Sequence, residues 1–244
     1  SLSSNKWDVS VVEEWDAATL DQYYNSCSLL CHFDSINPAG RFIDSSRNNF
    51  AITSSGGAGL STSQYKFGGA SAYFDGTNDY LTIADNTSLE PGSSDFTIEC
   101  FIYPTVNGSY LGIFSKRATN VNYATIQVLI NNGTMLMFAS TSGASWAANV
   151  TATSSPPLNV WSHIAVVRYG TSANNLVLYL NGTSVGAGSV SNTALVNNSD
   201  AWSIGSDAAT GGTGPFAGYI DEFRITKGVA RYTANFTPPS APFP

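Results

Sequence analysis

Apolar and polar residues alternate with a period of two along much of the chain after residue 26. In the segment DFTIECFIYP, one face carries four apolar side chains: Phe96, Ile98, Cys100 and Ile102. The opposite face carries two polar and two aromatic side chains: Thr97, Glu99, Phe101 and Tyr103. Alternation of this kind is typical of β-strands. The two aromatic residues on the second face indicate that this face is also partly covered, as in stacked sheets.

Turn residues divide the rest of the chain into further short strands. Asn132-Gly133 and Asn181-Gly182 each lie between two apolar runs, which predicts two β-hairpins. The runs SLLCHF, SAYFDGTNDYLTI, WSHIAVVRY, AWSIGS and GYIDEFRI predict the remaining strands, with a Gly/Asn turn inside the second of them. Helical periodicity is almost absent. We therefore expect an all-β fold in which two antiparallel sheets form a sandwich.

The two ends of the chain differ from this pattern. Residues 1–25 hold five acidic residues and one lysine, without a convincing apolar stripe. We treat them as a connector that is either a short helix around 13–24 or an extended arm packed on a partner chain. The prolines of TPPSAPFP lack N–H donors, so this segment is expected to leave the sandwich as an extended strap. The expected division is an arm at 1–25, a domain at 26–238 and a Pro-rich tail at 239–244.

Two adjacent acids, Asp221 and Glu222, interrupt the apolar run GYIDEFRI. The apolar phase slips between Ile220 and Phe223, which indicates a β-bulge or a strand buried on both faces. A buried carboxylate needs a partner, because burying an unpaired charge is costly. Asp221 is therefore expected either to bind a metal or to accept hydrogen bonds from loop N–H groups. A third alternative is an ion pair with Arg224 or Arg168.

Calcium is the metal that this interpretation favours. Ca²⁺ takes six to eight oxygen ligands, which carboxylates and backbone carbonyls supply together. Asp44 in FIDSSRNNF lies in a loop rich in such oxygens, and Asp34 in HFDS is a further candidate. The sequence alone leaves open which of Asp34, Asp44 and Asp221 would share one site.

Composition narrows the classes of function. Only 11% of residues are charged and the net charge is −7, which argues against nucleic-acid binding. The polar surface must come from Ser, Thr, Asn and Gly, as in many extracellular and virion β-proteins. The three cysteines do not make a disulfide framework, and we expect them to be free. No apolar run reaches transmembrane length, so we expect no membrane insertion.

Candidate catalytic motifs do not support an enzyme. The segment GGASAYF does not supply the Gly-x-Ser-x-Gly strand-to-helix elbow of a serine hydrolase, and the two histidines, His32 and His163, each lie alone within an apolar run. Glycoside hydrolysis needs two carboxylates at a controlled separation, and no Glu-x-Asp-x-(x)-Glu arrangement occurs. The expectation is a protein that is not an enzyme.

The order of several motifs resembles a known family. The segments SLLCHFDS, FIDSSRNNF, YKFGGASAYFDGTNDYLTI, DFTIECFIYP, WSHIAVVR, LYLNGTSVG and GYIDEFRITKGVARYTANFTPP follow one another as in laminin-G-like, concanavalin A-like jelly-roll domains. The resemblance covers about residues 26–238. It is strongest to the version found in bacteriophage and marine virus virion proteins. It implies two antiparallel sheets with a concave face, and a structural Ca²⁺ near Asp221 with the Asp44 loop as its partner.

Two functions follow from the resemblance as expectations. The first is a non-enzymatic phage virion protein, such as a tail fibre, spike or surface decoration, with a lectin-like domain for host-surface glycans. It would be a homo-oligomer, contact other virion proteins through its N-terminal arm, and be assembled in the host cytoplasm. The alternative is a carbohydrate-binding or adhesion module of a bacterial surface protein. Tyr110 and Trp146 lie in loop-like stretches and are the candidate glycan-binding residues in either case.

Overall fold

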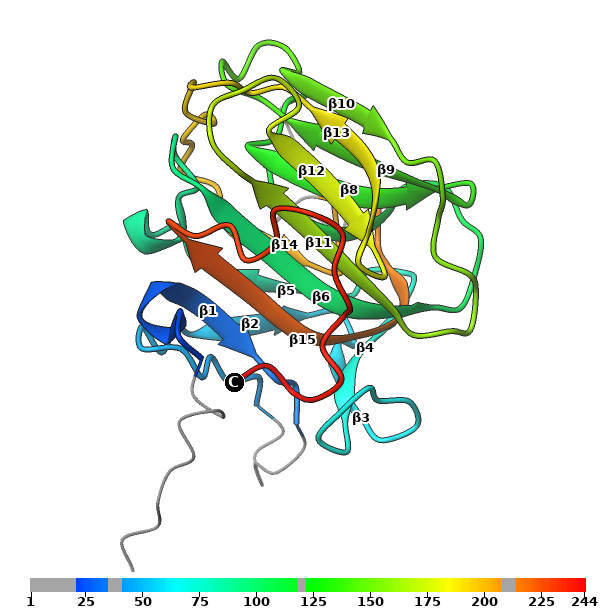
Figure 1. The fold of residues 1–244 in the computed structure, drawn as a ribbon. Helices are drawn as coiled ribbons and strands as arrows, with labels where there is room; N and C mark the ends of the chain where they lie inside the picture. The colour runs from blue at the N-terminus through cyan, green and yellow to red at the C-terminus, as the bar shows by residue number, and fades with distance from the viewer. Residues whose placement is uncertain (1–20, 35–40, 118–121, 208–213) are drawn as a thin grey trace, which may run out of the picture.

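The computed structural model describes residues 21–34, 41–117, 122–207 and 214–244, and these form two packed antiparallel sheets (Figure 1). The eight-stranded sheet runs β13 (Thr183–Gly188), β12 (Leu176–Leu180), β11 (Ser162–Arg168), β6 (Phe96–Pro104), β15 (Ala217–Lys227), β4 (Ser71–Asp75) and β3 (Gly59–Ser61), and β1 (Cys27–Cys31) pairs with β15. The seven-stranded sheet runs β10 (Ala148–Thr151), β9 (Thr134–Ala139), β8 (Ile126–Asn131), β7 (Leu111–Lys116), β14 (Trp202–Ile204), β5 (Tyr80–Ile83) and β2 (Ile52–Ser55). The all-β jelly-roll sandwich is confirmed.

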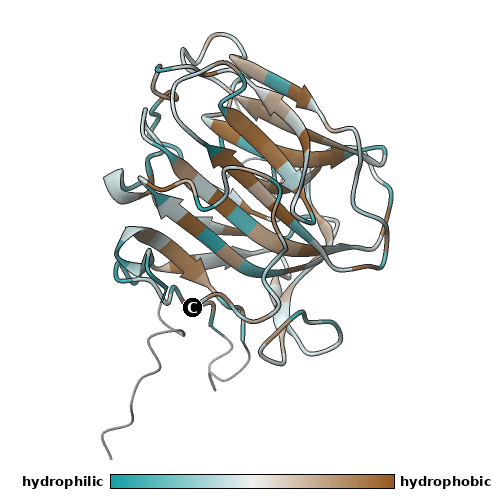
Figure 2. Ribbon diagram, viewed as in Figure 1, coloured by the Kyte–Doolittle hydropathy of each residue, from teal (hydrophilic) through white to brown (hydrophobic). Residues whose placement is uncertain are grey.

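The main core lies between the two sheets and is built by the alternation seen in the sequence. The four expected inward residues of β6, from Phe96 to Ile102, are all buried in this core. Trp202 of β14 faces them from the other sheet and is fully buried. Figure 2 shows most of the hydrophobic positions in the strands, whereas the connecting loops are mainly intermediate to hydrophilic. Apolar burial at roughly 25 cal/mol per Å² is the main term that holds such a sandwich together.

Both predicted hairpins are present. β8 and β9 meet at Asn132-Gly133, and β12 and β13 meet at Asn181-Gly182. Asn132 and Asn181 have φ of 48° and 49°, and the glycines that follow have φ of 79° and 76°. Positive φ at both central residues defines the type I′ turn, whose twist matches that of the flanking strands.

β15 is the strand that ties the eight-stranded sheet together. It pairs along one edge with β6, and along the other edge first with β4 and then with β1. Its register against β6 shifts between Asp221 and Arg224, and Glu222 has φ of 53°. The predicted bulge is therefore confirmed. Both acids are fully buried, so this strand is also covered on both faces.

Some strands differ from the sequence expectation. The two pieces of SAYFDGTNDYLTI do not stay together: β4 joins the eight-stranded sheet and β5 joins the seven-stranded sheet. The turn between them carries the chain from one layer to the other. Four strands, β2, β3, β7 and β10, were not expected. Three of them are short, with three or four residues each, so their alternation is too brief to stand out.

The expectation that TPPSAPFP leaves the sandwich is wrong, because residues 228–244 fold back across the outer face of the eight-stranded sheet (Figure 1). From here on we call residues 228–244 the strap. Phe236 packs on Tyr179 of β12, and Phe243 is buried against Phe101 of β6. The strap thus covers Phe101, one of the two aromatic residues on the second face of β6.

At the other end, residues 24–26 form a single 3-10 turn (η2, Tyr24–Ser26) before β1. Most of the expected arm, residues 1–20, lies outside the described residues. A second 3-10 turn (η3, Thr87–Leu89) follows β5. The described residues contain no helix long and apolar enough to cross a lipid bilayer.

Candidate functional site

A buried ionic cluster lies between the eight-stranded sheet and the strap. Glu99 on β6 is its centre and is fully buried. Its Oε1 accepts hydrogen bonds from Arg224 Nη2 and Nε at 2.8 and 3.0 Å. Its Oε2 lies 3.2 Å from His163 Nε2 and accepts a hydrogen bond from the Tyr232 hydroxyl at 2.8 Å. Every oxygen of this carboxylate is satisfied by the protein itself, so the cluster holds the strap down and leaves no open position for a ligand.

The charges in this cluster also set the pKa of Glu99. Burial alone would raise it, but the nearby charges of Arg224, His163 and Arg231 outweigh burial and lower the pKa to about 2. Arg231 of the strap in turn forms a two-pronged hydrogen bond with Asp21, just before η2. The network therefore connects both ends of the described chain to the sheet.

Asp221 and Glu222 both lie on the outer side of the bulge. Asp221 Oδ2 accepts hydrogen bonds from the backbone N–H groups of Lys66 and Phe67 at 2.7 and 3.1 Å. Glu222 Oε2 accepts from the backbone N–H of Phe243, and its carboxylate lies 3.0 Å from His32 Nδ1. Asp221 is thus a hydrogen-bond acceptor for a loop, the second of the three alternatives, while Glu222 anchors the end of the strap.

The pKa values of Asp221 and His32 are both raised, but for different reasons. Burial raises the pKa of Asp221 to about 7, although the backbone N–H donors oppose this. The pKa of His32 is raised by its hydrogen bond to Glu222, against the effect of burial.

The third alternative for Asp221, an ion pair with Arg224 or Arg168, does not hold. Arg224 pairs with Glu99, and Arg168 donates to two backbone carbonyls.

The other predicted calcium ligands are held in separate places. Asp44 is buried, and both of its oxygens accept hydrogen bonds, from the N–H groups of Leu30, Ser46 and Phe50 and from the Ser46 hydroxyl. Asp34 Oδ1 is buried and has no hydrogen-bond partner among the described residues, and a side chain at Gly68 would collide with it.

Within the described residues, no group of three or more His, Cys, Asp or Glu side chains is placed to hold a metal ion. The donors around Asp44 and Asp221 are N–H and O–H groups, which occupy the lone pairs that a cation would need. Calcium at Asp34, Asp44 or Asp221 therefore stays a prediction, and it would require these hydrogen bonds to rearrange.

The two predicted glycan-binding residues lie at different parts of the seven-stranded sheet. Trp146 is half-buried in an aromatic cluster, with ring centroids 5.0 Å from Tyr123 and 5.1 Å from Phe138. Tyr110 is 54% exposed just before β7, with φ of 55°. Phe138 lies opposite Gln127, near one end of β8, whereas Tyr110 precedes Leu111, which pairs near the other end. The structure therefore does not bring Tyr110 and Trp146 into one site.

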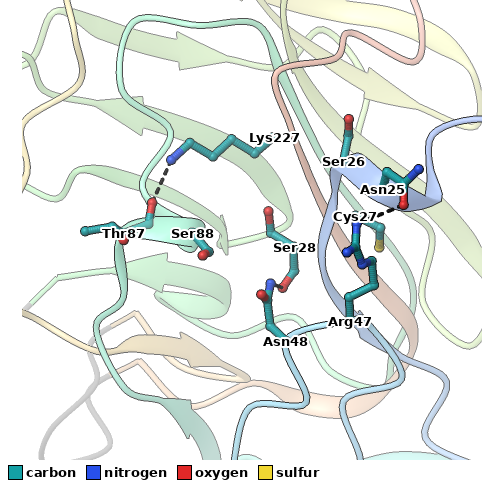
Figure 3. Close-up of a pocket in the computed structure, with 9 residues that line it drawn as sticks. All are labelled: Asn25, Ser26, Cys27, Ser28, Arg47, Asn48, Thr87, Ser88 and Lys227. Atoms are coloured by element: carbon teal, nitrogen blue, oxygen red, sulfur yellow. Dashed lines mark hydrogen bonds between the residues drawn. The ribbon is translucent and has the colours of Figure 1, made fainter.

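A polar hollow, which the sequence did not predict, lies beside the start of β1 (Figure 3). Its volume is about 580 Å³. Its lining consists of amide, hydroxyl, thiol and cationic side chains: Asn25, Ser26, Cys27, Ser28, Arg47, Asn48, Thr87, Ser88 and Lys227. These come from η2, β1, the loop before β2, η3 and the end of β15. The sequence did not predict this site, because its lining residues have no characteristic spacing and come together only in the folded chain.

The two cations of the polar hollow are bonded to neutral groups. Arg47 Nη1 donates to Asn25 Oδ1 at 2.9 Å, and Lys227 Nζ donates to the backbone carbonyl of Thr87 (Figure 3). No acidic side chain is among the described residues that line the hollow. The hollow therefore offers hydrogen-bond donors and positive charge to a ligand, and it contains no pair of carboxylates for hydrolysis.

Comparison with known proteins places this fold. A family model described as the concanavalin A-like lectin/glucanases superfamily matches residues 75–231. The chain belongs to this superfamily. No curated protein sequence matches it.

Several solved structures share this superfamily fold. The binding domain of Paraclostridial Mosquitocidal Protein 1 is 17% identical with a TM-score of 0.61, covering 84% of this chain and 50% of that one. The botulinum neurotoxin serotype D binding domain is 15% identical with a TM-score of 0.64, covering 85% and 49%. Domain 4 of the arabinanase AbnA from Geobacillus stearothermophilus, in complex with arabinotriose, is 16% identical with a TM-score of 0.60, covering 84% and 93%.

The two toxin neighbours are described as binding domains, and the third neighbour is one domain of an arabinanase with arabinotriose bound. The chain spans about half the length of the toxin binding domains and nearly the whole of the arabinanase domain. At 14 to 17% identity the likeness establishes the fold, and the ligand has to be argued from this chain's own residues.

Proposed function

We propose that this chain is a non-enzymatic carbohydrate-binding module, and that the polar hollow of Figure 3 holds the glycan. The observation that carries this is the chemistry of the lining. Hydroxyl groups of Ser26, Ser28 and Ser88 lie there beside the amides of Asn25 and Asn48. Such groups both donate and accept hydrogen bonds, and each hydroxyl of a sugar does the same.

The shape and polarity of the hollow fit a hydroxylated ligand. Its volume of about 580 Å³ lies within the range of roughly 300–1,000 Å³ that is usual for small-molecule sites. Most such sites are lined by apolar and aromatic groups, whereas this lining is polar. A flat apolar ligand would leave these polar groups unpaired, which is costly, while a sugar would pair them.

The solved neighbours support this assignment. One of them is a domain in complex with arabinotriose, and another is a botulinum neurotoxin binding domain in complex with SialylT. A lectin-like fold with a hydroxyl-lined and amide-lined hollow is consistent with glycan binding here as well.

The test is a glycan array probed with the whole chain and with the double variant Arg47→Ala/Asn48→Ala. Both side chains are exposed, so the double variant is expected to fold. Their loss should reduce array signals at least severalfold, since each removes polar contacts worth about 1 kcal/mol or more. The matched control is Asn192→Ala, an exposed amide in the loop after β13, which should leave binding unchanged.

Two other results would redirect the proposal. Binding that survives in the double variant but is lost in Trp146→Ala or Tyr110→Ala would move the glycan to the predicted aromatic residues. Absence of any signal for the unaltered chain would contradict carbohydrate binding itself.

For its biological setting, we propose a phage virion, where the module would serve in a tail fibre, spike or surface decoration that contacts host glycans. Support comes from the resemblance of RITKGVARYTANFTPP to virion domains, and from three buried free cysteines that suit assembly in a reducing cytoplasm. A module of a bacterial surface protein is the second setting. The native mass of the chain separates the two settings, because a fibre or decoration protein is expected to be a multimer and a tethered module a monomer.

A further inference from the structure

Four aromatic side chains form a row across four neighbouring strands of the eight-stranded sheet. They are Tyr73 of β4, Tyr219 of β15, Tyr103 of β6 and Trp161, the residue just before β11. Tyr219 is directly opposite both Tyr73 and Tyr103 in the strand register. Ring centroids along the row are 5.0, 5.8 and 5.5 Å apart, close to the ~4.8 Å separation of adjacent strands. We call this set the aromatic row.

The aromatic row lies on the outer face of the sheet, beyond the part that the strap covers. Phe101 precedes Tyr103 by two positions on the same face of β6, and it is buried under Phe243. Tyr73 is 38% exposed, and the other three members of the row are half-buried. Trp161 packs against the Phe101–Phe243 cluster, which fixes one end of the row. The rings are thus held by the fold and are still open to solvent.

The polar atoms of the row have no partners within the described part of the chain. The hydroxyls of Tyr73, Tyr103 and Tyr219 and the indole N–H of Trp161 make no hydrogen bond to another described residue. Each side chain therefore offers ring surface for apolar contact and a polar atom for hydrogen bonding. None of these four polar atoms is among the buried unpaired atoms of the described residues, so water reaches them in the free chain and the hydroxyl groups of a ligand can replace that water.

We propose that the aromatic row is a second carbohydrate site, which binds an extended linear polysaccharide running across the strands. The inference rests on the proposed function and names the form of its ligand. A polymer of sugar rings presents an apolar C–H face and hydroxyl groups at each unit, and the row presents matching chemistry at each strand. Neighbouring rings are inclined by 44°, 79° and 56°, so the row suits a chain that twists from one unit to the next.

A protein partner fits the row less well. A stable interface buries about 800 Å² on each partner. An aromatic side chain has on the order of 200 Å² of surface, and no member of the row is more than 38% exposed. The open area is a narrow strip, which matches a single polymer chain better than the face of a second protein.

Affinity gel electrophoresis tests the proposal. The whole chain is run through native gels that contain linear arabinan, xylan or mixed-linkage glucan, beside Tyr73→Ala and Tyr103→Ala variants. We expect at least one polysaccharide to retard the unaltered chain. Each variant should weaken that retardation by roughly two- to tenfold, the range of an aromatic contact. Tyr169→Ala removes an exposed tyrosine just after β11, outside the row, and should behave as the unaltered chain.

Chain length gives a second readout. Oligosaccharides cut from the retarding polysaccharide should compete with it for the chain. Their competition should become stronger as they lengthen, until they span the four rings. The Tyr73→Ala variant should reach its plateau with a shorter oligosaccharide, because Tyr73 is at the end of the row. Melting temperature measured for each variant separates loss of binding from loss of folding.

Three outcomes would overturn the proposal. One is that no polysaccharide of the panel retards the unaltered chain, and another is that the Tyr73 and Tyr103 variants are retarded equally to it. The third is that these variants change the native mass and not the retardation, which would make the row a contact between copies. The polar hollow is tested separately, because short glycans on an array depend on Arg47 and Asn48 and should be unaffected by Tyr73→Ala.

Discussion

At the scale of single residues, Glu99 is the buried carboxylate that joins β6, β11, β15 and the strap. It satisfies Arg224, His163 and Tyr232 together. Glu99→Gln is expected to lower the free energy of unfolding at pH 7 by about 3–5 kcal/mol, because it leaves the buried Arg224 with only its longer ion pair to Asp21. Urea unfolding followed by tryptophan fluorescence measures this. Asp75→Asn, at an exposed carboxylate, is the matched control and should cost little.

Acid should weaken the fold through the same carboxylate. The folded pKa of Glu99 is about 2, below the ordinary value of roughly 4.3. The stability that it contributes is therefore complete above pH ~4 and is lost as the pH falls towards 2. The unaltered chain should lose a few kcal/mol over this range, and Glu99→Gln should lose much less. A parallel decline in both proteins would show that other carboxylates cause the acid transition.

The carboxylate of Asp221 supports two competing predictions about calcium. If it only accepts hydrogen bonds from Lys66 and Phe67, then Asp221→Ala should destabilise the chain by about 2–4 kcal/mol equally in calcium and in chelator. If it also binds calcium, the loss should be larger in calcium than in chelator. Melting temperatures in the two buffers distinguish these cases, and calcium that fails to stabilise the unaltered chain would contradict the metal.

At the scale of elements, the strap behaves as a covering layer for the eight-stranded sheet. Phe243 is buried, stacks over the guanidinium of Arg224 at 4.0 Å and donates its N–H to Glu222. Phe243→Ala should destabilise the chain by roughly 3 kcal/mol, which is the lower end of the range for replacing a buried Phe with Ala. Pro242→Ala, at the exposed neighbour, should be close to neutral. Equal melting temperatures for the two variants would mean that the end of the strap is loosely held.

Elements with strong periodicity could be predicted from the sequence, and assemblies of distant residues could not. The alternation from Phe96 to Tyr103 and the two Asn-Gly turns each reflect local geometry, so they identified β6 and both hairpins. The slip at Asp221-Glu222 predicted the bulge for the same reason.

The partners of those acids depend on long-range packing, which no local pattern records. Asp221 accepts hydrogen bonds from residues more than 150 positions away, and the polar hollow draws on four separate stretches of the chain. The sequence pointed to one member of the aromatic row, because Tyr103 lies on the second face of its strand. The neighbours of Tyr103 on β4 and β15 could be recognised only from the strand register. The separation of β4 from β5 depends likewise on which sheet each strand completes.

At the scale of the whole molecule, we predict that the chain assembles with further copies through residues 1–20. Asp21, the first described residue, is tied to Arg231 and Arg224, so a chain that starts there keeps these anchors. Deleting residues 1–20 should therefore leave the sandwich folded and reduce the native mass measured by light scattering. An unfolded product would contradict the arm as a separate segment.

The native mass of the unaltered chain tests the proposed setting. A virion fibre or decoration protein is expected to be a symmetric multimer, because homo-oligomers with closed symmetry are the common form of such assemblies. A stable multimer would support the virion, and a monomer would favour a tethered surface module. Repeating the measurement with chelator shows whether calcium takes part in the assembly.

The pairing of β1 with β15 has a consequence for how this protein is made. Cys27 lies opposite Thr226, so nearly the whole chain must leave the ribosome before β1 can pair with β15. Contacts between residues so distant in sequence slow folding, because the loop must close before the contact forms. The eight-stranded sheet can then be completed only after β15 has been synthesised and has emerged. Until that moment the nascent chain carries an unpaired apolar strand, which makes chaperone capture during translation a natural stage in its production.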